Sequence, residues 1–185
     1  MAYSLQFDGM LHTLSDENPQ NGGFLGYGWL LNRGDTEIAY GFGLFAQKRT
    51  VNSNLAEYLA LIEALEALLD LQIRNEHIEI RGDAKCVIDQ MTGAASISSL
   101  PTQRLYRRAR KLANQFRYLT WGWVPRNKNK PADKLSRRGL YQLFIKPNAY
   151  EMALSRLNTH QPDCSGFISL LDLRVYNPLN YGDAL

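Results

Sequence analysis

Residues 53–61 read Ser-Asn-Leu-Ala-Glu-Tyr-Leu-Ala-Leu and open the longest apolar stretch of the chain. Strong helix formers continue from there, so residues 55–71 are predicted to form a helix with Asn54 as its N-cap. At about 100° per residue, Glu57 lies roughly 120° from Glu63, among apolar neighbours. A carboxylate in that position must be paired, protonated or bound to a cation. Three acids fall within about 60° of one another and are expected to form the solvent-exposed stripe of the helix: Glu63, Glu66 and Asp70.

Segments on both sides of this helix alternate apolar and polar side chains, as half-buried strands do. The predicted strands cover residues 3–11, 24–31, 36–46, 77–81 and 118–124, and further helices cover 84–91, 102–116 and 132–145. Short connections between the first three strands favour an antiparallel meander. The mixed order of elements predicts an α/β (α+β mixed) fold, with helices packed on one mixed sheet.

A boundary is predicted between a main domain, residues 1–146, and a C-terminal extension, residues 147–185. A helix is expected over residues 149–158 of the extension, and an apolar segment over residues 167–176. That segment is too apolar for a free end, so it should be buried, either on its own domain or on a second copy. Docking on its own domain is favoured, because short linkers usually return a tail to the nearest apolar groove.

Composition narrows the classes of function. Of the 185 residues, 45% are hydrophobic and 21% are charged, an ordinary balance for one folded domain. No apolar run reaches the ~18–20 residues of a membrane span, and the N-terminus lacks the features of a signal peptide. The two cysteines form no disulfide framework or metal-binding pattern. Free thiols, a cytoplasmic location and no membrane partner are therefore expected.

The net charge of +3 conceals a dense basic block. Twelve of the 21 lysines and arginines lie between Arg104 and Arg138, where Asp133 is the one acid. Such a block fits a polyanionic partner, nucleic acid first. The plainer alternative is a solvated helix face.

Four acids occupy positions that secondary structure alone does not explain. Asp8 falls inside the first strand, and Glu57 lies off the acidic stripe of its helix. Asp83 follows a strand, where functional side chains of mixed sheets gather, and Asp133 opens a helix. Each also has a structural explanation: a solvated strand residue, an arginine partner, a helix cap and a helix-dipole partner, respectively.

Short motifs carry these acids in a fixed order. They read Phe-Asp-Gly at 7–9, Asn-Leu-Ala-Glu-Tyr at 54–58, Arg-Gly-Asp at 81–83 and Asn-Lys-Pro-Ala-Asp at 129–133. In order and spacing, the set resembles the ribonuclease H type 1 family over about residues 3–145. The resemblance implies a five-stranded mixed sheet flanked by helices, which agrees with the predicted order of elements.

The resemblance also implies an endonuclease that cuts the RNA strand of an RNA–DNA hybrid, using two Mg²⁺ ions and leaving 5′-phosphate products. Mg²⁺ prefers oxygen ligands, and two ions about 3.5–4 Å apart can activate water and stabilise the leaving oxygen. At the matching positions, Asp8 would bridge both ions. Glu57 and Asp83 would serve the leaving-group ion, and Asp133 the ion that activates water. Mn²⁺ is an alternative to Mg²⁺.

Other matching positions imply contacts with the hybrid. Gly9 would allow a close backbone approach, Asn54 would contact the hybrid near its minor groove, and Asn129 would lie near the scissile region. A helix cap and a turn stabiliser are the plainer roles of the two asparagines. Nonspecific phosphate contacts are expected from the predicted basic helix, through Arg107, Arg108 and Lys111.

The sequence departs from the family in the loop before Asp133. That loop, residues 125–131, is short and has no histidine where many members carry a catalytic one. Arg126 or a lysine of the loop is expected to take over part of that role, as well as contacting substrate. Because short loops recur among active relatives, activity is still expected.

Two other functions could use the same fold. One is a catalytically silent RNA- or hybrid-binding module, but a binder has no need of four carboxylates facing phosphates. The other is a nuclease for DNA junctions. Such nucleases space their acids differently from this chain and lack a motif like that of residues 54–58, which argues against this alternative. The oligomeric state is left open, with a monomer among the alternatives.

Overall fold

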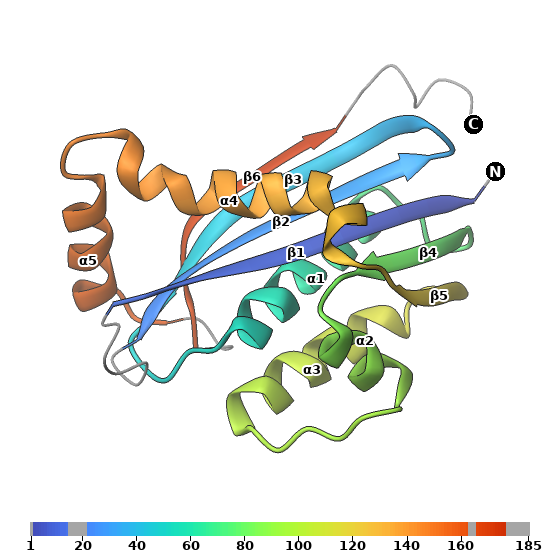
Figure 1. The fold of residues 1–185 in the computed structure, drawn as a ribbon, viewed down its shortest axis with the longest axis horizontal. Helices are drawn as coiled ribbons and strands as arrows, with labels where there is room; N and C mark the ends of the chain where they lie inside the picture. Colours follow the sequence, from blue (N-terminus) through green and yellow to red (C-terminus); the bar gives the residue numbers. More distant parts are fainter. Residues whose placement is uncertain (1, 15–21, 163–165, 177–185) are drawn as a thin grey trace.

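A six-stranded sheet runs through the computed structural model, which describes residues 2–14, 22–162 and 166–176 (Figure 1). The strands lie in the order β5-β4-β1-β2-β3-β6. The first three form the predicted antiparallel meander, and β4 and β5 run parallel to β1. The strand bounds are β1 Tyr3–Thr13, β2 Gly23–Arg33, β3 Thr36–Gln47, β4 His77–Gly82, β5 Tyr118–Trp123 and β6 Ile168–Tyr176.

Helices cover both faces of this sheet, which confirms the predicted mixed α/β fold (Figure 1). On one face lies α1, with α2 and α3 packed beside it. On the other face lies α4, and α5 packs against it and β6. The helix bounds are α1 Ser53–Asp70, α2 Lys85–Thr92, α3 Leu100–Ala113, η2 (a 3-10 turn) Arg126–Lys128, α4 Lys130–Ile145 and α5 Ala149–Thr159.

The C-terminal extension supplies the sixth strand, so the predicted count of five strands is one short. β6 pairs antiparallel with β3, from Ala46 opposite Ile168 to Ala39 opposite Tyr176. The apolar segment is therefore docked on its own chain. It covers an edge of β3 that would otherwise leave its backbone hydrogen-bonding groups unpaired.

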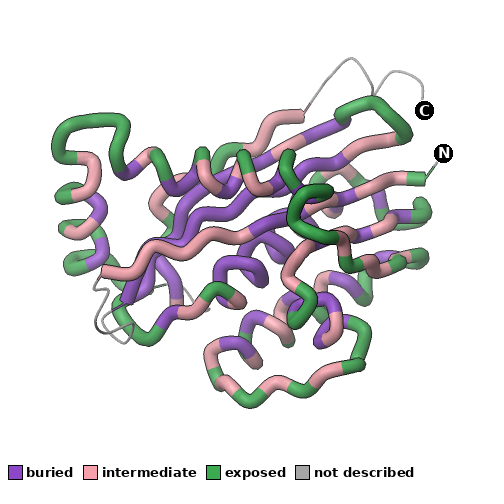
Figure 2. The backbone as a smooth tube through the Cα atoms, in the orientation of Figure 1, coloured by how far each residue is buried: buried purple, intermediate pink, exposed green. Residues whose placement is uncertain are grey.

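Two apolar cores separate the sheet from its helices. β2 is buried along most of its length, because it faces helices on both sides (Figure 2). Leu25, Tyr27 and Trp29 belong to the core beneath α1, whereas Phe24 packs in the second core with Leu140 of α4. This division follows from the alternation of side chains along a strand.

The start of α1 differs from the prediction. The helix begins at Ser53, and its N-cap is Asn52 rather than Asn54. The side chain of Asn52 accepts a hydrogen bond from the Leu55 amide at 3.1 Å, which satisfies one of the free donors of the first turn. Asn54 consequently lies inside the helix, and its side chain is available to another element.

The prediction that Glu63 faces solvent is wrong. Glu63 is buried, because β6 brings Arg174 over this side of α1. The guanidinium of Arg174 lies 2.7 Å from the Glu63 carboxylate, 2.8 Å from Asp70 and 3.6 Å from Glu66. The pattern within the helix could not reveal this contact, since Arg174 lies 111 residues after Glu63.

Among the described residues, no helix combines the length and the apolar character needed to cross a bilayer. Cys86 is a free and exposed thiol, and Cys164 lies outside the described residues.

Candidate metal centre

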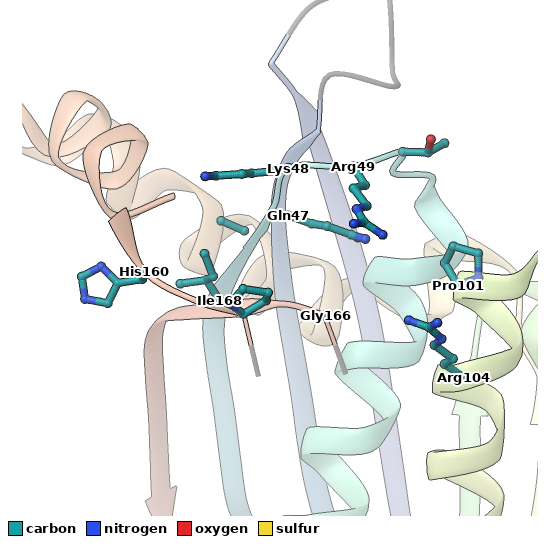
Figure 3. Close-up of a pocket in the computed structure, with 11 residues that line it drawn as sticks. Gln47, Lys48, Arg49, Pro101, Arg104, His160, Gly166 and Ile168 are labelled. Atoms are coloured by element: carbon teal, nitrogen blue, oxygen red, sulfur yellow. The ribbon is translucent and has the colours of Figure 1, made fainter. Parts of the chain in front are cut away.

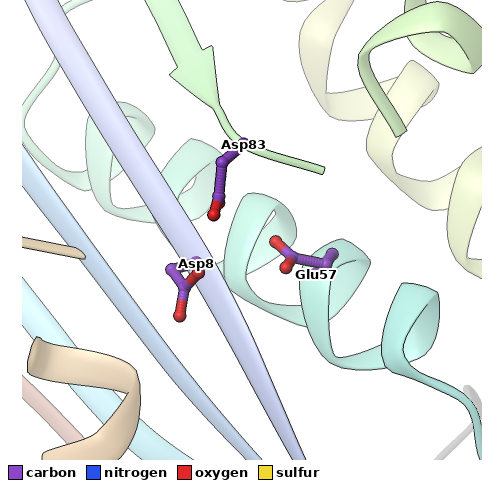
Figure 4. Close-up of side chains that lie close together, drawn as sticks. All are labelled: Asp8, Glu57 and Asp83. Atoms are coloured by element: carbon purple, nitrogen blue, oxygen red, sulfur yellow. The ribbon is translucent and has the colours of Figure 1, made fainter. Parts of the chain in front are cut away.

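Three of the four predicted acids meet at one place beside the sheet (Figure 4). Asp8 lies within β1, Glu57 lies near the start of α1, and Asp83 directly follows β4. One carboxylate oxygen from each lies within 4.8 Å of those of the other two. The structure thus brings together side chains from three elements that are far apart in the sequence.

The strand register explains the meeting of Asp8 and Asp83. β1 and β4 are parallel neighbours, with Gln6 opposite Arg81. Asp8 and Asp83 each follow this pair by two residues, so they reach the same level of the sheet. Side chains two residues apart along a strand also share one face, which gives both carboxylates the same side of the structure.

Gly9 explains how Glu57 joins them. A Cβ atom at Gly9 would collide with the main chain of Ala56 and Glu57, so only glycine lets α1 lie this close to β1. The close approach predicted at Gly9 therefore occurs between two elements of the chain itself. It places the Glu57 carboxylate next to Asp8.

Burial changes the acidity of this centre. Asp8 is 4% exposed and Glu57 is 8% exposed. Burial raises the pKa of Asp8 to about 7, opposed by a hydrogen bond from Ser136 and increased by the negative charges of Asp83 and Asp133. Burial, followed by the charge of Asp8, raises the pKa of Glu57 well above its usual range. Asp8 and Glu57 thus resist carrying their charges at this place.

These residues fit a divalent cation. Oxygen donors from three carboxylates match the ligand preference of Mg²⁺ and Mn²⁺. Among the described residues, the buried Oε2 atom of Glu57 has no hydrogen-bond partner, which is costly unless a cation or water binds there. A bound cation would also offset the burial and the repulsion that raise the pKa values of Asp8 and Glu57.

Asp133 stands outside this group of three and is neutralised by arginines. Arg126 lies 2.9 Å from one of its carboxylate oxygens, and Arg137 lies 2.7 Å from the other. Hydrogen bonds from Arg137 and then Arg126 lower the pKa of Asp133. The carboxylate nevertheless lies near enough for its charge to raise the pKa of Asp8.

Asn129, for which the motif suggested a place near the scissile region, is fully buried at 0% exposure. Its Nδ2 donates hydrogen bonds to the main-chain oxygen of Phe7 and to Oδ1 of Asp83, both at 2.9 Å. Asn129 therefore holds the Asp83 carboxylate against β1. In this structure it supports the acidic centre from within.

Three further residues contact the acids without having been predicted. Ser136 donates a hydrogen bond to Asp8, Arg137 pairs with Asp133, and the Trp123 indole donates to the main-chain oxygen of Asp83 at 3.0 Å. The signal for two of them was present, since Ser136 and Arg137 follow Asp133 by one helical turn. No comparable pattern marked Trp123.

The other predicted contact residues differ in their exposure and in their contacts. Asn54 reaches over to α2, where its Nδ2 lies 3.6 Å from Cys86 Sγ. The Arg126 side chain is 70% exposed beside the acidic centre. On α3, Arg107 and Lys111 are exposed, whereas Arg108 forms an ion pair of 2.6 Å with Glu66 of α1.

A cavity of about 560 Å³ opens near the end of β3 and the start of α3 (Figure 3). Its lining includes Lys48, Arg49, Arg104 and His160, and none of the four acids. The Nζ of Lys48 also donates a hydrogen bond to the main-chain oxygen of Asn158 at 3.2 Å. The cavity thus adds basic side chains to the face that holds the start of α3.

Comparisons with known proteins agree with this geometry. Residues 17–139 match the family described as reverse transcriptase-like. The ribonuclease HI of Halobacterium salinarum is 37% identical over 133 residues, which are 71% of this chain and 65% of that protein. The chain thus spans just under two thirds of the length of that curated relative.

Solved structures give the same result. The crystal structure of RNase H1 from Halobacterium salinarum NRC-1 is 35% identical, covers 76% of this chain and 98% of that one, and has a TM-score of 0.64. The N-terminal RNase H domain of a Mycobacterium tuberculosis protein, solved as a fusion with maltose-binding protein, is 29% identical. It covers 75% of this chain and 98% of that one, with a TM-score of 0.63.

The mixed sheet and its helices form a ribonuclease H-like fold. Carboxylates from β1, α1 and the end of β4 form an acidic centre on it. The chain belongs to the ribonuclease H family, within its type 1 group, as the sequence motifs indicated.

Proposed function

We propose that this chain is a metal-dependent endonuclease that hydrolyses the RNA strand of RNA–DNA hybrids and leaves 5′-phosphate ends. The observation that carries the proposal is the meeting of Asp8, Glu57 and Asp83, with a buried Glu57 oxygen that lacks a partner among the described residues. The 37% identity with a ribonuclease HI supports the reaction and the substrate. Cation binding would explain why the Asp8 and Glu57 carboxylates are buried next to a third acid.

Two Mg²⁺ ions, or Mn²⁺ ions, would supply an activated water and stabilise the leaving 3′ oxygen when bound. Asp8 belongs to the group it forms with Glu57 and Asp83, and the charge of Asp133 also acts on it, so its two oxygens suit a bridging role. Glu57 and Asp83 would hold the leaving-group side. Asp133 would hold the water side after Arg126 or Arg137 turns away from it.

Arg126 is suited to this exchange, because its side chain is largely exposed and carries a permanent charge. In the structure it neutralises Asp133 through a contact of 2.9 Å. With substrate bound, the same guanidinium would reach phosphate oxygens, which are preferred partners of arginine. Arg126 would thereby take over part of the role that a loop histidine has in other members of the family.

The substrate would be held mainly through its phosphates. Exposed Arg107 and Lys111 on α3, and the basic side chains that line the cavity, offer contacts that read charge and not base sequence. Asn54, whose side chain lies against Cys86 of α2, would contact the hybrid near its minor groove. The ribose 2′-hydroxyl is the group by which RNA differs from DNA at such a site.

The C-terminal extension has a structural part in this proposal. Residues 1–146 would form the catalytic unit, and residues 147–185 would stabilise it through β6. A cytoplasmic location of the enzyme belongs to the same proposal.

The test uses three labelled substrates: an RNA–DNA hybrid, a DNA duplex and an RNA duplex. Each is incubated with the protein in Mg²⁺, in Mn²⁺ and in EDTA. We expect cleavage of the RNA strand in the hybrid with either metal, no cleavage in EDTA, and no cleavage of the two duplexes. Binding without cleavage would instead show a silent hybrid-binding module, and cleavage of DNA would show a junction-type nuclease.

A further inference from the structure

Ser136 of α4 is completely buried at the acidic centre. Its hydroxyl donates a hydrogen bond to Oδ2 of Asp8, and its Oγ also lies 3.0 Å from the main-chain oxygen of Asp133. The hydroxyl has a single proton, so it can donate to only one of these acceptors. The carboxylate of Asp8 is the stronger acceptor when it is charged.

The fold provides the space for this contact. Asp8 lies directly opposite Gly28 in the pairing of β1 with β2. Side chains of directly opposed residues share one face of a sheet, so a larger residue at position 28 would stand beside Asp8. A Cβ atom at Gly28 would collide with the main-chain nitrogen of Ser136. The position beside Asp8 is therefore filled from the helix, by Ser136.

A second glycine keeps α4 in this place. A Cβ atom at Gly26 would approach the main-chain oxygen of Ser136 to 2.6 Å, so this part of α4 rests directly on the backbone of β2. Ser136 thus has little freedom to move away from Asp8. Its donor is fixed by the packing of a helix on a strand, which is more rigid than a loop.

We propose that Ser136 is a positioning residue that sets the orientation of the Asp8 carboxylate for cation binding. The hydroxyl occupies one lone pair of Oδ2, so the other lone pairs of the carboxylate would be left to hold cations. Being neutral, it orients Asp8 without cancelling the charge that attracts them, in contrast to the arginines around Asp133. This inference rests on the proposed metal-dependent function.

The test compares Ser136→Ala with the wild-type protein by isothermal titration of Mn²⁺ and Mg²⁺ in the absence of nucleic acid. We expect the dissociation constant to rise about tenfold, in the range found when partners of metal ligands are removed. Hydrolysis at saturating metal should also fall about tenfold. Ser155→Ala, on the exposed side of α5, is the matched control and should change neither quantity.

A second measurement separates positioning from a general loss of stability. In EDTA, the unfolding free energies of the wild-type protein, Ser136→Ala, Asp8→Ala and the double variant form a cycle that isolates the contact between the two residues. Alanine is used at position 8 because the amide oxygen of asparagine would still accept the hydrogen bond from Ser136. We expect the two changes to be non-additive. Additive changes, or wild-type metal affinity in Ser136→Ala, would overturn the proposal. Failure of the proposed function has a different signature, namely a wild-type protein that neither binds these metals nor cleaves the hybrid.

Discussion

Arg174 of β6 and Glu63 of α1 form a largely buried ion pair of 2.7 Å, in which 18% and 7% of the respective side chains are exposed. Burial raises the pKa of Glu63 to about 7, and the charge of Arg174 opposes that rise. The pair ties the C-terminal strand to the helix that carries Glu57. Its low exposure gives it a larger effect on stability than a surface pair has.

Replacing Arg174 should therefore destabilise the protein strongly. Arg174→Ala leaves Glu63 buried beside Glu66 and Asp70 without its counter-charge, and we expect a loss of about 3 kcal/mol in unfolding free energy. Urea denaturation measures this loss. Lys85→Ala is the control, because the exposed pair of Lys85 with Asp89 should contribute less than about 1 kcal/mol. Equal losses in the two variants would show that the Arg174 contact is not a buried one.

Metal affinity should depend on pH through Asp8. The pKa of Asp8 is raised to about 7 without metal, so protons compete with cations below that value. We expect the Mg²⁺ dissociation constant to rise by up to about tenfold for each pH unit below 7, and to level off above pH ~8. Calorimetric titration in a series of buffers measures it. A constant affinity between pH ~6 and ~8 would mean that Asp8 is already charged in the free protein.

The metal-free protein should become less stable as pH rises. Asp8 and Glu63 have pKa values of about 7 when folded, against ordinary values of 3.8 and 4.5. Between these limits the folded state binds more protons than the unfolded state, so stability declines as pH increases. Thermal unfolding in EDTA from pH ~5 to ~8 should show a falling midpoint. Asp8→Asn should flatten this decline, and an unchanged slope in that variant would remove Asp8 as a cause.

Asn129 should be needed for both stability and turnover. Asn129→Ala removes the donor shared by Asp83 and the Phe7 main chain, and we expect a loss of about 1–3 kcal/mol in unfolding free energy. Hydrolysis should fall about tenfold, since Asp83 loses the group that orients it. Asn127→Ala, in the same turn but exposed, is the control. If Asn129→Ala weakened only hybrid binding, Asn129 would be a substrate contact after all.

The sequence predicted some parts of the centre better than others, for physical reasons. Asp8 and Glu57 stood out because each acid contradicted the pattern of its strand or helix. Asp83 stood out because it directly follows a strand, within the Arg-Gly-Asp motif. Glu63 was misplaced because its partner, Arg174, comes from a strand added at the far edge of the sheet. The contact of Ser136 with Asp8 depends on how closely α4 approaches β2, which only the packed structure shows.

The boundaries of elements show the same limit. Asn52 and Asn54 are both good N-caps by residue type, and only the backbone geometry selects Asn52. The sixth strand was expected as a buried apolar segment, but its pairing with β3 is a long-range contact that no local pattern encodes.

The cleavage activity of the Asp8→Asn variant tests the central claim most directly, because Asp8 is the carboxylate that would bridge both cations. The variant is compared with the wild-type protein on a labelled RNA–DNA hybrid in Mg²⁺, and hybrid binding is measured separately in EDTA by fluorescence anisotropy. We predict that Asp8→Asn abolishes cleavage of the RNA strand while it keeps the fold and most of the hybrid affinity. A purified, folded Asp8→Asn protein that still cleaves the hybrid with Mg²⁺ at the wild-type rate would contradict the account.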